Sequence, residues 1–259
     1  MRRLAILVSL AFLAAPAAAQ DGLKVYISAD MEGLTGVVTG EQLGPGGFEY
    51  EAFREVMTGE VLAAIDGARA AGATEILISD SHGNGQNLLL DRLPDDVMVV
   101  RSWPRPLMMM QGIDETFDAA IFIGYHSGTT NPEGVRAHTM SSANLAGVKL
   151  NGIPVHEAGL NAAIAGHFGV PVVLVSGDDA TIEETRAIVG DIEGAVVKWA
   201  ISFHAATTLT PAAGRALIRE RVEAALRRLD DFEPFVLDTP VTLELGILAL
   251  LISQLIALP

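Results

Sequence analysis

The chain alternates between short apolar runs and longer segments in which apolar residues recur at helical spacing. Four runs are apolar over most of their length and then turn polar and glycine-containing at their C-terminal ends. This pattern is typical of buried parallel strands. The predicted strands cover residues 23–30, 74–83, 118–128 and 170–179.

Segments with a helical repeat lie between and after these strands. Apolar residues recur every three or four positions in residues 50–71, and residues 157–169 and 181–192 look similar. Residues 210–229 predict an amphipathic surface helix. The alternation predicts an α/β fold with a mostly parallel sheet flanked by helices. In such folds ligands bind beyond the carboxyl ends of the strands.

The first twenty residues have the three regions of a secretory signal peptide. Arg2 and Arg3 are basic, residues 4–15 are apolar, and residues 17–19 are all alanine. We therefore expect residues 1–20 to be removed and the mature protein to be periplasmic or secreted. Residues 21–259 are long enough for one α/β domain with a sizeable core.

Composition narrows the chemistry that the chain can perform. The sequence contains no cysteine, so it has neither disulfides nor thiolate metal ligands, and any metal must be held by His, Asp and Glu. The formal net charge of −15 argues against nucleic acid as a partner. No glycine-rich phosphate-binding motif follows a predicted strand.

Polar side chains at the strand ends form the candidate site. Asp30 and Glu32 lie two residues apart in "SADMEG", so on an extended strand both carboxylates project to one face. His82 in "SDSHG" and His126 in "GYHSG" follow two other strands. Carboxylates and imidazoles together suit zinc or a similar divalent ion, and several carboxylates permit a bridged pair of ions. Asp80 is a candidate partner that orients His82.

The sequence pattern alone does not assign roles to the other four histidines. His138 lies in a glycine-rich loop, and His156 adjoins Glu157 at the start of a predicted helix, where either residue could bind a metal. His167 and His204 are expected to be structural. Serine hydrolase chemistry is an alternative because serines also lie at strand ends near histidines, but the G-x-S-x-G elbow is missing.

Seven motifs in order carry a resemblance to a known family. They are "SADMEG", "SDSHG", "GYHSG", "HTMSS", "NGIPVHEAGLNA", "VVLVSGDD" and "VKWAISFHAATTLTP". The set resembles the M55 family of D-aminopeptidases, the type found in dipeptide-transport operons, from about residue 23 to about residue 245. The resemblance implies a zinc-dependent aminopeptidase that removes D-amino acids such as D-alanine from short peptides and assembles as a homo-oligomer.

The resemblance also implies roles for individual residues. The implied metal ligands are Asp30, Glu32, His82, His126 and Glu157. Asp30 would bridge two zinc ions, with Glu32 and Glu157 on one ion and the two histidines on the other. His138 would be the catalytic residue. Manganese or cobalt could occupy the same nitrogen and oxygen ligands.

We therefore expect residues 21–259 to form a single metallopeptidase domain that acts on short D-amino-acid-containing peptides. The apolar segment 246–259 departs from the family pattern. A buried terminal element and an oligomer contact are alternatives, and we favour the interpretation that it results from a truncation or frame shift. It is too short to span a bilayer, so no stable membrane anchor is expected. The alternative is a periplasmic protein that binds a metal or a peptide without turnover.

Overall fold

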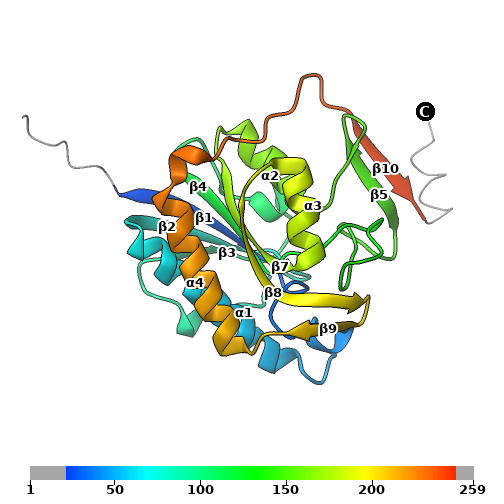
Figure 1. Ribbon diagram of the computed structural model, residues 1–259, viewed down its shortest axis with the longest axis horizontal. Helices are drawn as coiled ribbons and strands as arrows, with labels where there is room; N and C mark the ends of the chain where they lie inside the picture. Colours follow the sequence, from blue (N-terminus) through cyan, green and yellow to red (C-terminus); the bar gives the residue numbers. More distant parts are fainter. Residues whose placement is uncertain (1–21, 249–259) are drawn as a thin grey trace, which may run out of the picture.

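A computed structural model describes residues 22–248 and shows a seven-stranded central sheet in the order β3-β2-β1-β4-β7-β8-β9 (Figure 1). Its strands are β1 (Leu23–Ala29), β2 (Ala73–Asp80), β3 (Met98–Val100), β4 (Ala119–Ile123), β7 (Val172–Asp178), β8 (Glu193–Ser202) and β9 (Ala205–Thr208). All neighbours in this sheet are parallel except β8 and β9. The predicted α/β fold and the four predicted strands, which are β1, β2, β4 and β7, are confirmed.

Four α-helices cover the two faces of this sheet, and each lies within a few residues of its predicted range. They are α1 (Tyr50–Ala70), α2 (Glu157–His167), α3 (Asp179–Val189) and α4 (Pro211–Arg227). The α1 and α4 helices pack together on one face, and α2 and α3 pack together over the other. Because right-handed crossovers in opposite directions place their helices on opposite faces, α1 is separated from α2 and α3.

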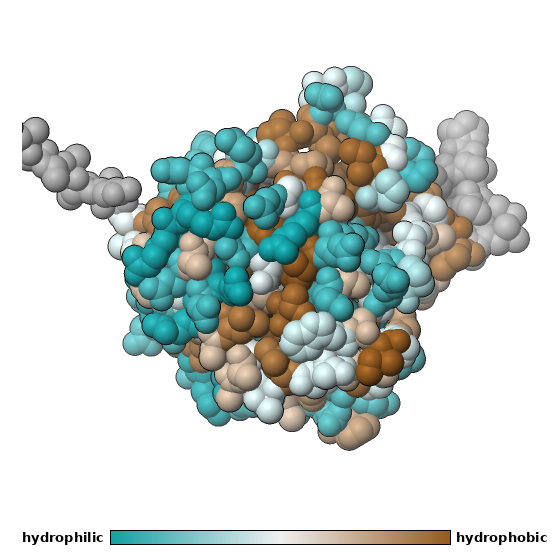
Figure 2. All heavy atoms as spheres, viewed as in Figure 1, coloured by the Kyte–Doolittle hydropathy of each residue, from teal (hydrophilic) through white to brown (hydrophobic). Residues whose placement is uncertain are grey.

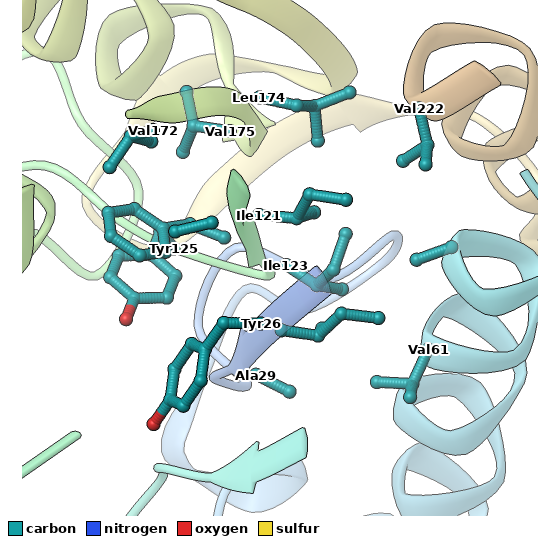
Figure 3. Packing of buried hydrophobic residues seen from close by; sticks show 14 of the residues in the cluster. Tyr26, Ala29, Val61, Ile121, Ile123, Tyr125, Val172, Leu174, Val175 and Val222 are labelled. Atoms are coloured by element: carbon teal, nitrogen blue, oxygen red, sulfur yellow. The ribbon is translucent and has the colours of Figure 1, made fainter. Parts of the chain in front are cut away.

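The core lies between the sheet and these helices. Ile121 and Ile123 of β4 point toward Val61 of α1 and Val222 of α4, whereas Tyr26 of β1 points to the opposite face (Figure 3). All five side chains are completely buried. Because successive residues of a strand face opposite sides, a strand covered on both faces must be apolar at every position. This explains the continuous apolar runs in the sequence.

A smaller antiparallel sheet was not predicted. It consists of β10 (Leu243–Ile247), β5 (Leu145–Leu150) and β6 (Ile153–Pro154), in that order. The predicted signal peptide and residues 249–259 of the apolar C-terminal segment lie outside the described residues. Between residues 22 and 248, no helix is long and apolar enough to cross a membrane.

The order of the strands creates a switch point between β1 and β4. From β1 the chain proceeds to β2 and β3 on one side, and from β4 it proceeds to β7 and β8 on the other. The connections therefore diverge and leave a crevice beyond the carboxyl ends of β1 and β4. This crevice is where the polar strand ends meet.

Candidate metal centre

The structure brings together the side chains that the sequence singled out at the strand ends. They surround a pocket of about 330 Å³, whose lining includes Asp30, Glu32, His82, His126, His138 and Glu157. The first four follow β1, β2 and β4, His138 lies in the loop after β4, and Glu157 is the first residue of α2. The close approach thus results from parallel strands that end at the same edge of the sheet.

Asp30 lies between two histidines. Its Oδ1 is 3.0 Å from Nδ1 of His82, and its Oδ2 is 3.4 Å from Nε2 of His126. Glu32 Oε2 is 2.9 Å from the same nitrogen of His82, and Glu157 Oε1 is 3.5 Å from the same nitrogen of His126. Each of these histidines therefore faces two carboxylates, and Asp30 is common to both.

Hydrogen bonds to the main chain fix the orientation of both rings. Nε2 of His82 lies 2.7 Å from the carbonyl oxygen of Leu43, and Nδ1 of His126 lies 3.0 Å from that of Ser127. A carbonyl oxygen can only accept, so these ring nitrogens donate. In a neutral ring the other nitrogen then presents a lone pair to the carboxylates, and only a proton or a cation between them makes this contact favourable.

Several buried atoms of the site lack a hydrogen bond within residues 22–248. They are Asp30 Oδ2, Glu32 Oε2 and His126 Nε2. Burying such atoms without a partner is costly, and a group of carboxylates is more costly still. A divalent cation would satisfy them together, since carboxylate oxygens and neutral imidazole nitrogens are ligands that zinc prefers. The residues present therefore fit a metal site.

The pKa shifts of His82 and His126 also indicate that the site favours a positive charge. Burial alone lowers the pKa of His82, but the carboxylates of Glu32 and Asp30 outweigh it and raise this pKa well above its usual range. Burial also lowers the pKa of His126, and Glu157 and Asp30 raise it well above its usual range. Without a metal, protons on these rings would supply the charge that a cation supplies in its presence.

The ligand atoms form two groups. Asp30, Glu32 and His82 lie together, and His126, His138 and Glu157 form the second group. The resemblance instead pairs Glu32 with Glu157 and one histidine with the other. The distances place Glu32 with His82 and Asp30 on one side and Glu157 with His126 and His138 on the other, and the second oxygen of Asp30 also faces His126.

His138 lies at the edge of the second group. Its Nδ1 donates to the carbonyl oxygen of Arg136 at 2.9 Å, and its Nε2 lies 3.9 Å from Glu157 Oε1. Its ring stacks on that of His126, with centroids 4.1 Å apart and an interplanar angle of 7°. The amide of Met140 donates to Glu157 at 2.6 Å and so ties this loop to α2. Because Nδ1 donates, Nε2 is the acceptor nitrogen of a neutral His138 ring, and it lies on the side of Glu157.

Comparison with known proteins places this arrangement in a family. The model of the peptidase M55 family, described as D-aminopeptidase, matches residues 23–258. The chain belongs to the M55 family. It is 36% identical over 215 residues to the D-aminopeptidase of Bacillus subtilis (strain 168), and the match covers 82% of this chain and 77% of that relative. Because the chain belongs to this family, it is a metallo-aminopeptidase. This contradicts the alternative of a protein that binds a metal or a peptide without turnover.

A solved structure of an M55 enzyme has the same fold. It is the Zn-dependent D-aminopeptidase DppA from Bacillus subtilis, described as a self-compartmentalizing protease. The match has a TM-score of 0.85 at 34% identity and covers 88% of this chain and 82% of that one. The similarity therefore extends over most of the α/β domain.

The structure distinguishes Glu157 from its neighbour His156, which the pattern could not. Nε2 of His156 lies 2.9 Å from the hydroxyl oxygen of Thr185 in α3, and the residue is completely buried. Burial lowers the pKa of His156 to about 4. In this M55 chain, Glu157 therefore faces the pocket and His156 packs neutral between α2 and α3.

The predicted role of Asp80 is wrong. Its carboxylate accepts hydrogen bonds from the amides of Asn87 and Leu88 and from the side chain of Asn87, at 2.6–2.8 Å. The His82 ring is held by a main-chain carbonyl instead, as described above. Asp80 therefore stabilises the loop that follows His82 and does not contact the imidazole.

Three further polar residues, His167, His204 and Asp178, lie outside the pocket, whereas Ser81 is part of its lining. His167 and His204 are exposed and take no part in the pocket. Asp178 caps α3 by accepting from the amide of Thr181 at 2.8 Å. Among the described hydrogen bonds no serine hydroxyl reaches a histidine ring, so the serine hydrolase alternative has no dyad.

Two features of the site were missed or left open in the sequence. The three consecutive methionines 108–110 fit either a core segment or an apolar pocket wall from the sequence, with core as the preferred interpretation. The structure shows both: Met108 and Met109 line the pocket with Trp103 and Met140, and Met109 and Met110 are buried in the core. Lys198 was also missed, although a single lysine inside the apolar strand sequence "VVKWA" could have revealed it.

Proposed function

We propose that this M55 member is a zinc-dependent aminopeptidase that hydrolyses short peptides beginning with a D-amino acid such as D-alanine, and that it uses two metal ions. The observation that carries the proposal is the position of Asp30, whose two carboxylate oxygens lie beside the ring nitrogens of two different histidines. A carboxylate in that position is suited to bridge two cations.

The distances suggest which residues would hold each ion. Glu32 and His82 would hold one, His126 and Glu157 the other, and Asp30 both. When bound, such a zinc pair supplies an activated water and polarises a carbonyl group. The same ligands could hold manganese or cobalt.

His138 is the proposed proton carrier. Because its Nδ1 donates to a main-chain carbonyl, its Nε2 can accept a proton from the attacking water and return it to the leaving amine. Glu157, 3.9 Å away, would stabilise the imidazolium that forms between these two steps. Trp103, Met108 and Met140 would exclude bulk water and contact the substrate side chain.

The proposed action on free amino termini rests on the M55 relatives, which are named D-aminopeptidases. The described lining contains three carboxylates and neither lysine nor arginine. Two bound zinc ions would outweigh this negative charge, so the charge of the lining by itself does not select an ammonium group. The preference for D-amino acids rests on the M55 relatives, since pocket shape, and not the identity of these residues, reads chirality.

The test is the release of D-alanine from D-Ala-D-Ala, with L-Ala-L-Ala as the control. The purified protein is assayed as isolated, after removal of metal with a chelator, and after addition of zinc. We expect zinc-dependent cleavage of the D-peptide only. A folded protein that binds two zinc ions and cleaves neither peptide would refute the proposal.

We also propose that the protein forms a homo-oligomer. Large apolar side chains are exposed along the small sheet and near it, among them Val241, Leu243 and Leu245. Figure 2 shows hydrophobic residues at this edge and down the middle of the face, between α3 and α4. Light scattering after size-exclusion chromatography should give a mass of several subunits.

Export, predicted from residues 1–20, would bring the enzyme to cell-wall peptides that contain D-alanine.

A further inference from the structure

Lys198 of β8 is a completely buried lysine outside the proposed ligand set. Burying an ammonium group is expensive unless all of its protons are bonded, so lysine is almost never found fully buried without partners. Its neighbour Trp199 points outward and is exposed, which agrees with the alternation of a strand. The position of Lys198 therefore needs an explanation that the apolar core does not provide.

The ammonium group of Lys198 is fully satisfied by main-chain carbonyls. Its Nζ donates to the carbonyl oxygens of Glu32, Leu34 at 3.2 Å and Val37 at 2.7 Å. An ammonium group has three protons and no acceptor, so these three contacts use all of its donors. All three acceptors belong to residues 32–37, more than a hundred and sixty positions away in sequence.

Residues 31–37 form neither helix nor strand, so their carbonyl oxygens lack the partners of regular structure. Within the segment, the carbonyl oxygens of Met31 and Leu34 accept turn bonds from the amides of Leu34 and Val37 at 3.2 Å. The segment starts at the end of β1 and crosses the carboxyl ends of the neighbouring strands. The amide of Gly33 donates to the carbonyl oxygen of Gly124, just after β4, at 2.7 Å. The amide of Thr35 donates to Glu60 of α1 at 2.9 Å. Lys198 binds three carbonyl oxygens of this segment at once.

Glu32 lies between two of these anchors. Its own carbonyl oxygen accepts from Lys198, and the amide of the next residue, Gly33, donates to Gly124. The two contacts fix the peptide group between Glu32 and Gly33 from both sides. Because a side chain leaves its backbone in a direction set by the flanking peptide groups, they also direct the Glu32 carboxylate toward His82.

We propose that Lys198 is a positioning residue for the metal centre: it holds the main chain of Glu32 so that the carboxylate meets His82 at the ligand distance. The inference rests on the proposed function, because it assumes that Glu32 and His82 bind a metal ion. Lys198 contacts neither the substrate nor the reacting atoms in this assignment. It acts on the site only through the backbone of residues 32–37.

The test is metal binding by Lys198→Met, which keeps an unbranched apolar side chain of the length of the lysine stem but removes the ammonium group. Zinc affinity is measured by competition with a chromophoric chelator, and the visible spectrum of the cobalt-loaded protein reports ligand geometry. We expect one of the two ions to bind about 10- to 100-fold more weakly, as is typical when a residue that supports a metal ligand is lost. The cobalt spectrum should change as well.

Val222→Ala is the matched control, because Val222 is completely buried in α4 and does not belong to the pocket lining. It should lower the melting temperature without changing zinc affinity or the cobalt spectrum. If Lys198→Met does not fold, Lys198→Gln, which keeps an amide donor, is measured in the same way.

Each outcome decides the proposal. Unchanged affinity and spectrum in a folded Lys198→Met protein would overturn it. Failure of both Lys198 variants to fold would assign the lysine to fold stability alone and would also overturn it. A wild-type protein that binds no zinc would instead refute the proposed function, so the two failures are distinguishable.

Discussion

Replacing Asp80 by asparagine should destabilise the loop that follows His82. The Asp80 carboxylate accepts from the Asn87 amide at 2.6 Å, the Leu88 amide at 2.8 Å and the Asn87 side chain at 2.7 Å. Asparagine can keep the two main-chain bonds through its oxygen, but its NH₂ group then faces the Asn87 NH₂ group. Two donors would meet where a charged acceptor now lies.

The Asn87 side chain cannot turn round to relieve this contact. Its Oδ1 accepts from the hydroxyl of Tyr50 at 2.7 Å, and its Nδ2 also donates to the carbonyl oxygen of His82 at 2.7 Å. Losing one hydrogen bond to a buried charged group costs about 1.5–3 kcal/mol, and the remaining two bonds also weaken, so we expect a loss of about 2–4 kcal/mol. In a chain of this size that corresponds to a melting temperature lower by roughly 4–16 °C.

The assay is thermal unfolding of the metal-free proteins, followed by circular dichroism. Asp118→Asn is the matched control, because this exposed aspartate accepts only one main-chain bond, from the amide of Lys24 at 2.7 Å. It should cost less than about 1 kcal/mol. If Asp80→Asn proves no more destabilising than Asp118→Asn, the loop does not depend on the Asp80 carboxylate and our reasoning is wrong.

Three further predictions concern the site itself. His138→Ala should lower kcat for D-Ala-D-Ala by about 10²–10⁴-fold, as expected for loss of a proton carrier. Its zinc content, measured by atomic absorption, should be unchanged. Activity equal to that of the wild-type protein would exclude His138 as the proton carrier. Because neighbouring carboxylates overcome the effect of burial and raise the pKa values of His82 and His126, protons compete with zinc up to those raised values. Zinc affinity by calorimetry should therefore continue to increase with pH above the ordinary histidine value and level off only above the raised values, and a flat profile would contradict this. The same protons stabilise the metal-free fold fully below that ordinary value, and this stabilisation is lost as pH rises through the raised values. Gly33→Ala should not yield a stably folded protein, because the added Cβ would lie 1.8 Å from the carbonyl oxygen of Tyr125; a wild-type melting temperature would refute it.

The central fold could be predicted from the sequence because its strands are covered on both faces. Every residue of β4 and β7 is buried, so the apolar runs were continuous and ended where the strands end. The hairpin of β8 and β9 was missed because its outer half is exposed, with Ile201 at 70% exposure. The small sheet was missed because its pairing joins distant segments, such as Leu243 with Leu150.

The site was partly predictable for the same reason. Asp30, His82 and His126 follow parallel strands, and the carboxyl ends of parallel strands share one edge. Glu157 was identified only through the family motif, since His156 beside it is an equally good ligand chemically. The role of Asp80 was predicted wrongly, because sequence proximity to His82 does not reveal which groups its carboxylate meets.

The sequence by itself determined which segments are buried strands, that their polar ends gather at one edge, and that any metal there has only nitrogen and oxygen ligands. Only the tertiary structure decided where each side chain points. In the fold, His156 faces α3 and Glu157 faces the pocket. Asp30 lies between two imidazoles, and Lys198 donates to the carbonyl oxygen of Glu32. These directions depend on packing between elements that are far apart in sequence, and no local pattern of apolar and polar residues encodes that packing.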